Sequence, residues 1–196
     1  SLATVPDDLR ACRPTIFFAV PRVWQKFHDA MLDQIAEKPR PVRTLIDKYI
    51  ELGLASVDAG QHGPAMSAKQ QRLHRALDRT IGGQLRHKAG LDQARIVVSS
   101  AAPIHPDLVR WFHAVGLPIA EVWGQTEDCG PATINPPSAI KIGTVGTPLP
   151  DLDVTIAGDG ELLVRGGSVC AGYYGHTEAT SELIDDDGWM STGDLG

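Results

Sequence analysis

Residues 95–123, RIVVSSAAPIHPDLVRWFHAVGLPIAEVW, decide the fold class of this chain. Residues 95–99 are a short apolar run of strand length, and a helical pattern begins at Pro106 and ends at Gly116. Residues 118–123 then read as a second strand. Because two strands joined by a helix pair in parallel through a right-handed crossover, this stretch predicts a doubly wound α/β sheet.

The sequence upstream of this unit extends the same architecture. Residues 15–20 (TIFFAV) are a candidate for a buried strand. Helical spacing of apolar residues then predicts helices over residues 21–37, 42–57 and 67–88, the last with a break at Gly82–Gly83. We therefore expect residues 1–138 to form a partial α/β subdomain.

The sequence downstream differs in composition and in its pattern of apolar residues. Glycine and proline become frequent, and long helical patterns disappear. Alternating apolar residues flank a turn at residues 158–160, which is typical of a β-hairpin, and residues 187–188 mark a second tight turn. We expect residues 139–196 to form a small antiparallel β subdomain, such as a half-barrel.

Charge is distributed unevenly along the 196 residues, whose net charge is -6. Residues 1–120 carry 16 basic and 11 acidic side chains, whereas residues 121–196 carry 2 basic and 13 acidic ones. The acidic second region would repel phosphate, so we expect no nucleic-acid partner. The basic side chains on the helix predicted over residues 67–88 are interpreted as a solvated face, the alternative being contact with the phosphates of a ligand or with an acidic partner. These side chains are Lys69, Arg72, Arg75, Arg79, Arg86 and Lys88.

Compartment and membrane contact can also be addressed from composition. No apolar run approaches membrane-spanning length, so we expect no membrane span, while peripheral membrane association stays open. The three cysteines form no C-x-x-C pair, which favours a reducing cytosol and a cytoplasmic protein.

Two loops follow neighbouring predicted strands, where open α/β sheets bind ligands. The small residues 99–103 let a flat ligand approach the backbone. In residues 123–128, a base could stack on Trp123, worth ~1–3 kcal/mol by analogy with stacking platforms. The hydroxyl of Thr126 and the carboxylate of Glu127 could hold Mg²⁺. The alternative is that Trp123 is a core aromatic and Glu127 a helix-start charge.

Asp194 is a third element near the end of the chain. It follows the turn after Gly188. One carboxylate can accept hydrogen bonds from two adjacent sugar hydroxyls, as the acidic residue of dinucleotide-binding folds does. The alternative is a solvated turn aspartate without a ligand.

Five segments in this order resemble the adenylate-forming superfamily, specifically AMP-forming long-chain fatty acyl-CoA ligases. They are residues 18–24 (FAVPRVW), 99–104 (SSAAPI), 123–127 (WGQTE), 143–150 with 160–174, and 189–194 (WMSTGD). Together they extend over nearly the whole chain. Two residues depart from the family pattern, because Ser100 replaces a glycine and Trp123 replaces a tyrosine.

The resemblance implies an activity and a site. Family members join a fatty acid to AMP with release of pyrophosphate, then transfer the acyl group to coenzyme A, using ATP and Mg²⁺. Residues 1–138 would be the nucleotide- and acyl-binding subdomain. The implied ATP/AMP-binding residues are Ser100, Ala101, Ala102, Pro103, Trp123, Gly124, Gln125, Thr126 and Asp194. Thr126 and Glu127 would be catalytic, with Glu127 also the Mg²⁺ ligand, and Trp24 would lie near the fatty-acyl tunnel.

The resemblance also predicts that this chain is a central fragment of such a ligase. Its phosphate-binding loop would precede residue 1, and the catalytic lysine of the C-terminal domain would follow residue 196. We therefore expect the isolated chain to be inactive and to self-associate through exposed sheet edges. Two alternatives stay open, namely an adenylate-forming enzyme for another carboxylic acid and a non-catalytic remnant that only binds.

Overall fold

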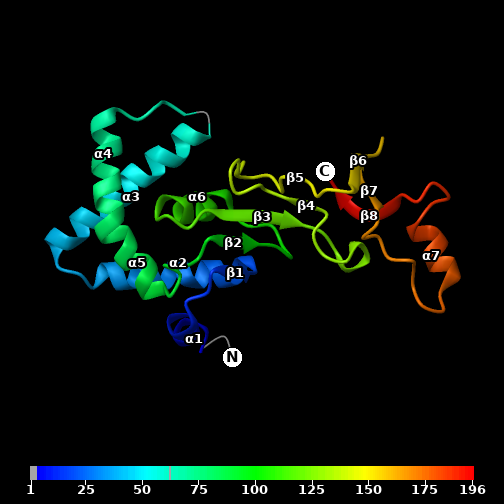
Figure 1. Ribbon diagram of the computed structural model, residues 1–196, viewed down its shortest axis with the longest axis horizontal. Coiled ribbons are helices and arrows are strands. Elements are labelled where there is room, and N and C mark those ends of the chain that lie inside the picture. Colours follow the sequence, from blue (N-terminus) through cyan, green and yellow to red (C-terminus); the bar gives the residue numbers. More distant parts are fainter. Residues whose placement is uncertain (1–3, 62) are drawn as a thin grey trace. The chain divides into compact units, whose positions relative to one another are not determined.

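The computed structural model describes residues 4–61 and 63–196 and divides into two compact units (Figure 1). The first unit comprises the described residues up to Glu121 together with Pro137–Thr144. The second comprises Val122–Pro136 and Val145–Gly196. The subdomain boundary expected between residues 138 and 139 stays a prediction.

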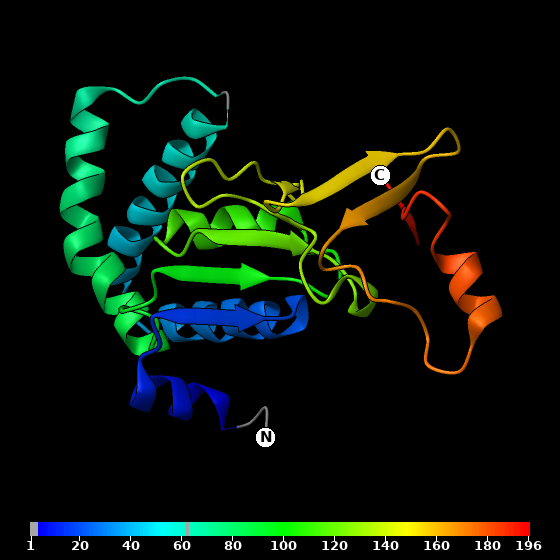
Figure 2. The same cartoon turned by 45° about the vertical axis from the view of Figure 1, so that its right-hand side comes forward.

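Three parallel strands begin a five-stranded sheet, in the order β1 (Ile16–Ala19), β2 (Ile96–Ser99) and β3 (Ile119–Trp123), of which the part up to Glu121 belongs to the first unit (Figure 2). Ile16 is opposite Ile96, and Val97 is opposite Ile119. The parallel pairing of β2 with β3 confirms what the strand–helix–strand pattern predicts, and the mixed α/β class is confirmed with it.

The first unit also contains helices. They are α1 (Val5–Cys12), α2 (Pro21–Ala36), α3 (Arg40–Gly60), α4 (Ala68–Leu77), α5 (Gly83–Ala89) and α6 (Pro106–Ala114). Helix α6 packs against α2 and α3, and α1 packs against α5. None of the helices within residues 4–61 and 63–196 is long and apolar enough to cross a membrane.

The helix predicted over residues 67–88 is interrupted by a π-helical turn at Asp78–Gly82. A Cβ atom on Gly82 would lie 2.3 Å from the Tyr49 hydroxyl, so the position has no room for a side chain. The chain stays helical through the predicted break at Gly82–Gly83, because the π-helical turn leads directly into α5, and the structure shows a local change of helical pitch there.

The core of the first unit is built around Trp24, which is fully buried. Its indole ring makes edge-to-face contacts with Phe17 and Phe112, with centroids 5.2 Å and 5.0 Å away. Its N–H lies 3.2 Å from the Ala19 carbonyl oxygen and 3.3 Å from that of Val98. The one polar atom of this side chain is thereby satisfied inside the core.

Arg86 does not belong to the solvated basic face that the sequence predicts. It donates to Asp78 Oδ1 at 2.7 Å and to the Val115 carbonyl oxygen at 2.8 Å, and Tyr49 donates to the same Asp78 oxygen at 2.8 Å. Burial alone would raise the pKa of Asp78, but the hydrogen bonds from Arg86 and Tyr49 outweigh it, so the pKa lies below its ordinary value. The interpretation was wrong for Arg86 because charge periodicity does not reveal an acidic partner on the same helical segment.

Short antiparallel strands dominate the second unit. The end of β3 pairs with β4 (Thr133–Ile134), and β4 pairs with β5 (Thr147–Pro148). A separate sheet has the order β6 (Leu152–Ile156), β7 (Glu161–Gly166) and β8 (Met190–Leu195). Its first two strands form the predicted hairpin.

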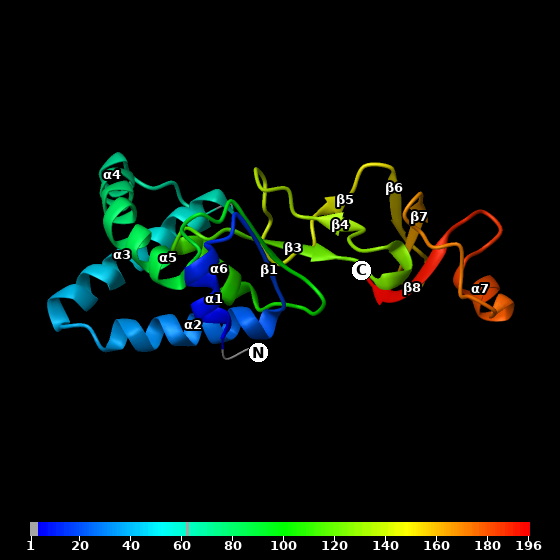
Figure 3. The same cartoon turned by 60° about the horizontal axis from the view of Figure 1, so that its bottom comes forward.

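One helix of the second unit is not indicated by the sequence pattern. This is α7 (Thr177–Leu183), which lies beside β8 (Figure 3). It has no buried residue, so it lacks the apolar stripe by which longer helices are recognised. The small core of this unit is formed by Ala132, Val164 and Met190.

Candidate functional site

Trp123 and Asp194 form a directly bonded pair in the second unit. The indole N–H of Trp123, at the end of β3, donates to Asp194 Oδ2 at 2.7 Å. Since the N–H bond lies in the ring plane, this contact fixes the orientation of the indole without covering either face. Oδ1, the second oxygen of Asp194, is not used by this bond. The two residues predicted to hold adenine and ribose are thus brought together across 71 positions of sequence.

Asp194 is positioned by the turn that carries it. Gly193 has a φ of 73°, in the region that favours glycine, and its N–H donates to Glu161 Oε1 at 2.8 Å. The Thr192 hydroxyl donates to the Leu162 carbonyl oxygen at 2.7 Å and accepts the N–H of Asp194 at 3.1 Å. The carboxylate is therefore exposed but stands on a backbone anchored to β7.

A tight turn presents Thr126 and Glu127 after β3. Residues Thr126–Asp128 form one 3-10 turn, and the Gln125 N–H donates to Asp128 Oδ1 at 2.9 Å. A Cβ atom on Gly124 would lie 1.9 Å from the Gly130 carbonyl oxygen, so only glycine fits there. The Thr126 side chain is exposed, which leaves its hydroxyl accessible to a ligand.

Asp128 has no assigned role from sequence reasoning, yet it supports this turn. It is only 1% exposed. Burial raises the pKa of Asp128 above its ordinary value. Its Oδ2 has no hydrogen-bond partner within the part of the chain that the structure describes. The sequence shows Asp128 as a second acidic residue beside Glu127. Asp128 differs from Glu127 in being buried, and the sequence alone does not reveal that difference.

Glu127 is held at two points by the segment that follows β7. Its carbonyl oxygen accepts the N–H of Cys170 at 2.7 Å. Its Oε1 accepts the hydroxyl of Tyr173 at 2.7 Å, and that hydrogen bond raises the pKa of Tyr173. Sequence reasoning included Tyr173 in a family motif but gave it no role.

The donor set around Glu127 suits one kind of cation. Among the described residues, no cluster of three or more histidine, cysteine or acidic side chains could enclose a metal ion. Glu127 and Thr126 therefore offer a carboxylate and a hydroxyl, and not a complete protein cage. Mg²⁺ is commonly bound this way, by one or two carboxylates together with water and substrate phosphates.

The remaining predicted residues lie in the first unit. Ser100, Ala101, Ala102 and Pro103 follow β2, with Ser100 half-buried and the other three exposed. Ala101 has a φ of 70°, a left-handed conformation that costs about 1–2 kcal/mol for a residue with a Cβ atom. Trp24 lies in the core, and its predicted place near an acyl tunnel stays a prediction.

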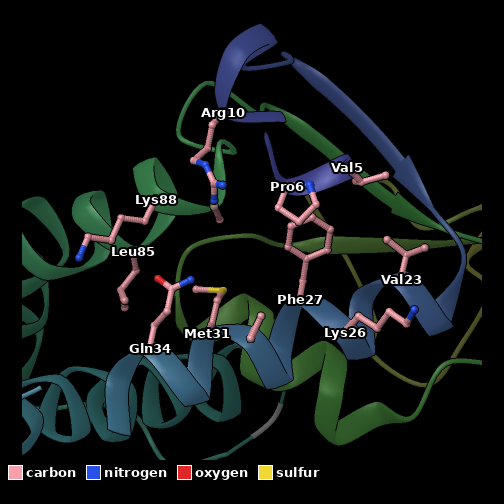
Figure 4. A pocket seen from close by; sticks show the side chains of 12 residues that line it. Val5, Pro6, Arg10, Val23, Lys26, Phe27, Met31, Gln34, Leu85 and Lys88 are labelled. Atoms are coloured by element: carbon pink, nitrogen blue, oxygen red, sulfur yellow. The ribbon is translucent and has the colours of Figure 1, made fainter. Parts of the chain in front are cut away.

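A pocket in the first unit lies between α1, α2 and α5 (Figure 4). Most of its lining is apolar, and Phe27 and Met31 contribute from α2. Three basic side chains also line it, Arg10, Lys26 and Lys88. The positive charge of Lys38 lowers the pKa of Lys88, and Arg10 is paired with Asp7.

Comparison with known proteins decides the family. The family model described as AMP-binding enzyme matches residues 2–174. The chain belongs to this family. Among its AMP-binding relatives, a Mycobacterium tuberculosis protein named as the fatty-acid--CoA ligase FadD11 is 37% identical over 193 residues, covering 98% of this chain and 34% of the relative. The long-chain-fatty-acid--CoA ligase ACSBG2 of Gallus gallus is 32% identical over 203 residues, covering 98% of this chain and 26% of the relative.

Solved structures of AMP-binding enzymes share the fold. A malonyl-CoA ligase in a ternary product complex with methylmalonyl-CoA and AMP superimposes with a TM-score of 0.60 at 21% identity. The match covers 100% of this chain and 33% of that structure. This chain therefore spans about a third of the length of the proteins it matches. The expected family and the mixed α/β fold class are confirmed.

Proposed function

We propose that this chain is the nucleotide- and acyl-binding part of an AMP-forming long-chain fatty acid–CoA ligase, an enzyme of lipid metabolism. The reaction joins a fatty acid carboxylate to AMP, releases pyrophosphate and transfers the acyl group to the thiol of coenzyme A. The observation that carries the proposal is the pairing of Trp123 with Asp194 beside Glu127 in one unit of an AMP-binding family member.

The adenosine half of ATP is proposed to lie on Trp123. One indole face would stack on the base, and Asp194 Oδ1 would accept a ribose hydroxyl while Oδ2 remains bonded to the indole N–H. Gly124 and Gln125 would form the wall beside the base. For residues 100–103, which belong to the first unit, nucleotide binding through the backbone stays a proposal of its own, supported by the small side chains that leave this backbone accessible.

The phosphates are proposed to face Thr126 and Glu127. The Thr126 hydroxyl would donate to a phosphate oxygen, and Glu127 would bind Mg²⁺ through its free carboxylate oxygen. When bound, this cation supplies positive charge that neutralises the phosphate oxygens. The hydrogen bond from Tyr173 keeps the Glu127 carboxylate oriented before any ligand arrives.

The fatty acid is proposed to bind along α2. The apolar pocket between α1, α2 and α5 suits an acyl chain, and Lys26 and Lys88 suit a negatively charged group at its rim. Trp24, on the same helix, would border the acyl tunnel. Coenzyme A is the proposed acyl acceptor.

Further properties of the chain are proposals of the same kind. We propose a cytoplasmic location, peripheral membrane contact and self-association of the isolated chain. Self-association is supported by β1, which is an edge strand of its sheet and leaves Ile16 63% and Phe18 57% exposed. Light scattering that finds a clean monomer would count against self-association.

ATP–pyrophosphate exchange tests the proposed activity. The complete native polypeptide would be assayed with Mg²⁺ and a panel of fatty, aromatic and amino acids, with this chain alone as the comparison. We expect exchange that depends on long-chain fatty acids in the complete protein, and none from this chain alone. Exchange with another acid class would favour the alternative substrate. No exchange from a folded complete protein would favour a non-catalytic binding remnant.

A further inference from the structure

Tyr173 stands on a segment that is fixed independently of its hydroxyl. Its N–H donates to Thr180 Oγ1 at 2.9 Å, and that hydroxyl donates to the His176 carbonyl oxygen at 2.9 Å. A Cβ atom on Gly172 would lie 2.3 Å from the Thr180 side chain, so the segment lies tightly against α7. The phenol is therefore directed at Glu127 by a helix that contributes nothing else to the site.

The Tyr173 hydroxyl makes the two carboxylate oxygens of Glu127 unequal. Oε1 accepts the Tyr173 hydroxyl at 2.7 Å, a short hydrogen bond to a charged acceptor. Oε2 is the oxygen that remains for a cation. A carboxylate held in this way can coordinate through Oε2 while the Tyr173 bond stays intact. Coordination through both oxygens would make Oε1 share its electron density between the cation and the Tyr173 hydroxyl, which weakens Oε1 as a ligand.

One-oxygen and two-oxygen coordination differ between hard cations. Mg²⁺ requires near-octahedral geometry and takes single carboxylate oxygens together with water and phosphates. Ca²⁺ is larger, takes six to eight oxygens and often binds a carboxylate through both of them. The hydrogen bond to Oε1 weakens the second carboxylate contact that Ca²⁺ often uses, and therefore penalises Ca²⁺ more than Mg²⁺.

We propose that Tyr173 is a positioning residue that makes Glu127 a one-oxygen ligand and so favours Mg²⁺ over Ca²⁺ on the bound nucleotide. The proposal rests on the proposed nucleotide site. It assigns cation choice to a tyrosine that does not touch the cation. Tyr174 provides a matched control, because it is the neighbouring phenol and is fully exposed.

The first arm of the test needs no nucleotide. Phenolate absorbance is followed against pH in this chain, and subtraction of the Tyr173→Phe curve isolates the titration of Tyr173, while circular dichroism verifies that the fold persists. We expect Tyr173 to titrate above the ordinary range in the wild type, and its pKa to fall in Glu127→Gln. Identical Tyr173 titrations with and without the Glu127 charge would overturn the proposal, whatever the chain binds.

The second arm measures cation preference by calorimetry. The dissociation constants of ATP are compared in Mg²⁺ and in Ca²⁺ for the wild type, Tyr173→Phe and Tyr174→Phe. We expect the preference for Mg²⁺ to fall about threefold or more in Tyr173→Phe, the lower range of one net hydrogen bond, and to stay constant in Tyr174→Phe. An unchanged preference in Tyr173→Phe with intact ATP binding overturns this proposal alone. Absence of ATP binding from the folded wild type overturns the nucleotide site as well.

Discussion

The two units of the molecule are held together in different ways. Among the described residues, the first unit buries a cluster of 19 apolar side chains around Trp24 and Phe112, whereas the buried cluster of the second consists of Ala132, Val164 and Met190. The second unit instead orders its exposed residues through hydrogen bonds such as Trp123–Asp194 and Tyr173–Glu127.

This difference separates stability from ligand binding. Burial of apolar surface is the larger stabilising contribution, so substitutions in the first core should act on unfolding. The bonded pairs of the second unit lie at its surface, with Trp123 and Glu127 half-buried, and their hydrogen bonds contribute less to folding, so loss of these bonds should act mainly on ligands. Substitutions in the two units should therefore have separable effects on stability and on ligand binding.

The largest effect is expected for Trp24→Ala. It removes a fully buried aromatic ring and should lower the free energy of unfolding of the first unit by about 3–5 kcal/mol. Urea denaturation measures the change. The control is Leu32→Ala on the same helix, where the side chain is 40% exposed. Equal destabilisation by the two substitutions would contradict the described core.

A smaller effect, but on chemistry, is expected for Glu127→Gln in the complete protein. Loss of the charge should lower the adenylation rate about 100-fold, as for other groups that stabilise transition-state charge. Fatty acid binding should change much less. Pyrophosphate exchange and fatty acid binding are measured side by side, with Glu178→Gln, an exposed residue of α7, as the control. Equal loss of rate and of fatty acid binding would argue against a metal role for Glu127.

Trp123→Phe tests the contribution of the Trp123–Asp194 hydrogen bond to ligand binding in the second unit. The substitution keeps an aromatic face but removes the N–H donor to Asp194. Loss of one hydrogen bond to a charged group should weaken AMP binding about tenfold. Calorimetry measures the affinity, and Trp189→Phe in the same unit is the control. Unchanged affinity would mean that the Trp123–Asp194 bond does not prepare the site.

The smallest effect is a pH dependence confined to the first unit. Burial lowers the pKa of His113 below its ordinary value of 6.5, and its Nε2 lies 2.9 Å from the Ile119 carbonyl oxygen. Because the pKa of His113 is lower in the folded chain, His113 of the unfolded chain takes up a proton at a higher pH than His113 of the folded chain as the pH falls. The stability contribution is therefore present above pH 6.5 and is lost as the pH falls through the folded pKa.

Urea midpoints of the first unit at a series of pH values below neutrality measure this dependence. His113→Gln should flatten the profile of the first unit, while His176→Gln, an exposed position in the second, should leave it unchanged. A profile that keeps its slope without His113 would assign the effect to other groups.

Local patterns were enough to predict most of the fold. The strand–helix–strand unit of residues 95–123 and the hairpin of β6 and β7 follow from apolar periodicity and turn residues, which act between near neighbours in sequence. Helix α7 was not predicted because it buries no side chain. The π-helical turn at Asp78–Gly82 lies against Tyr49 of another helix, and apolar periodicity does not reveal such a contact between distant residues.

The candidate site was likewise predicted in part, since the sequence indicated its residues but not the contacts between them. Motif resemblance indicated Trp123, Glu127 and Asp194, because their residue types and order are specific. It could not indicate that Trp123 bonds to Asp194, or that Tyr173 bonds to Glu127, since these partners are 71 and 46 positions apart. Such contacts depend on how β8 and the segment before α7 fold against the end of β3.

AMP binding to this chain, measured by calorimetry for the wild type, Asp194→Asn and Asp186→Asn, tests the central claim most directly. The account predicts that the wild type binds AMP, that Asp194→Asn weakens binding about tenfold or more through loss of a charged hydrogen-bond acceptor, and that the exposed Asp186→Asn control binds as the wild type does. Equal affinity of all three proteins, or no binding by a folded wild type, would contradict it.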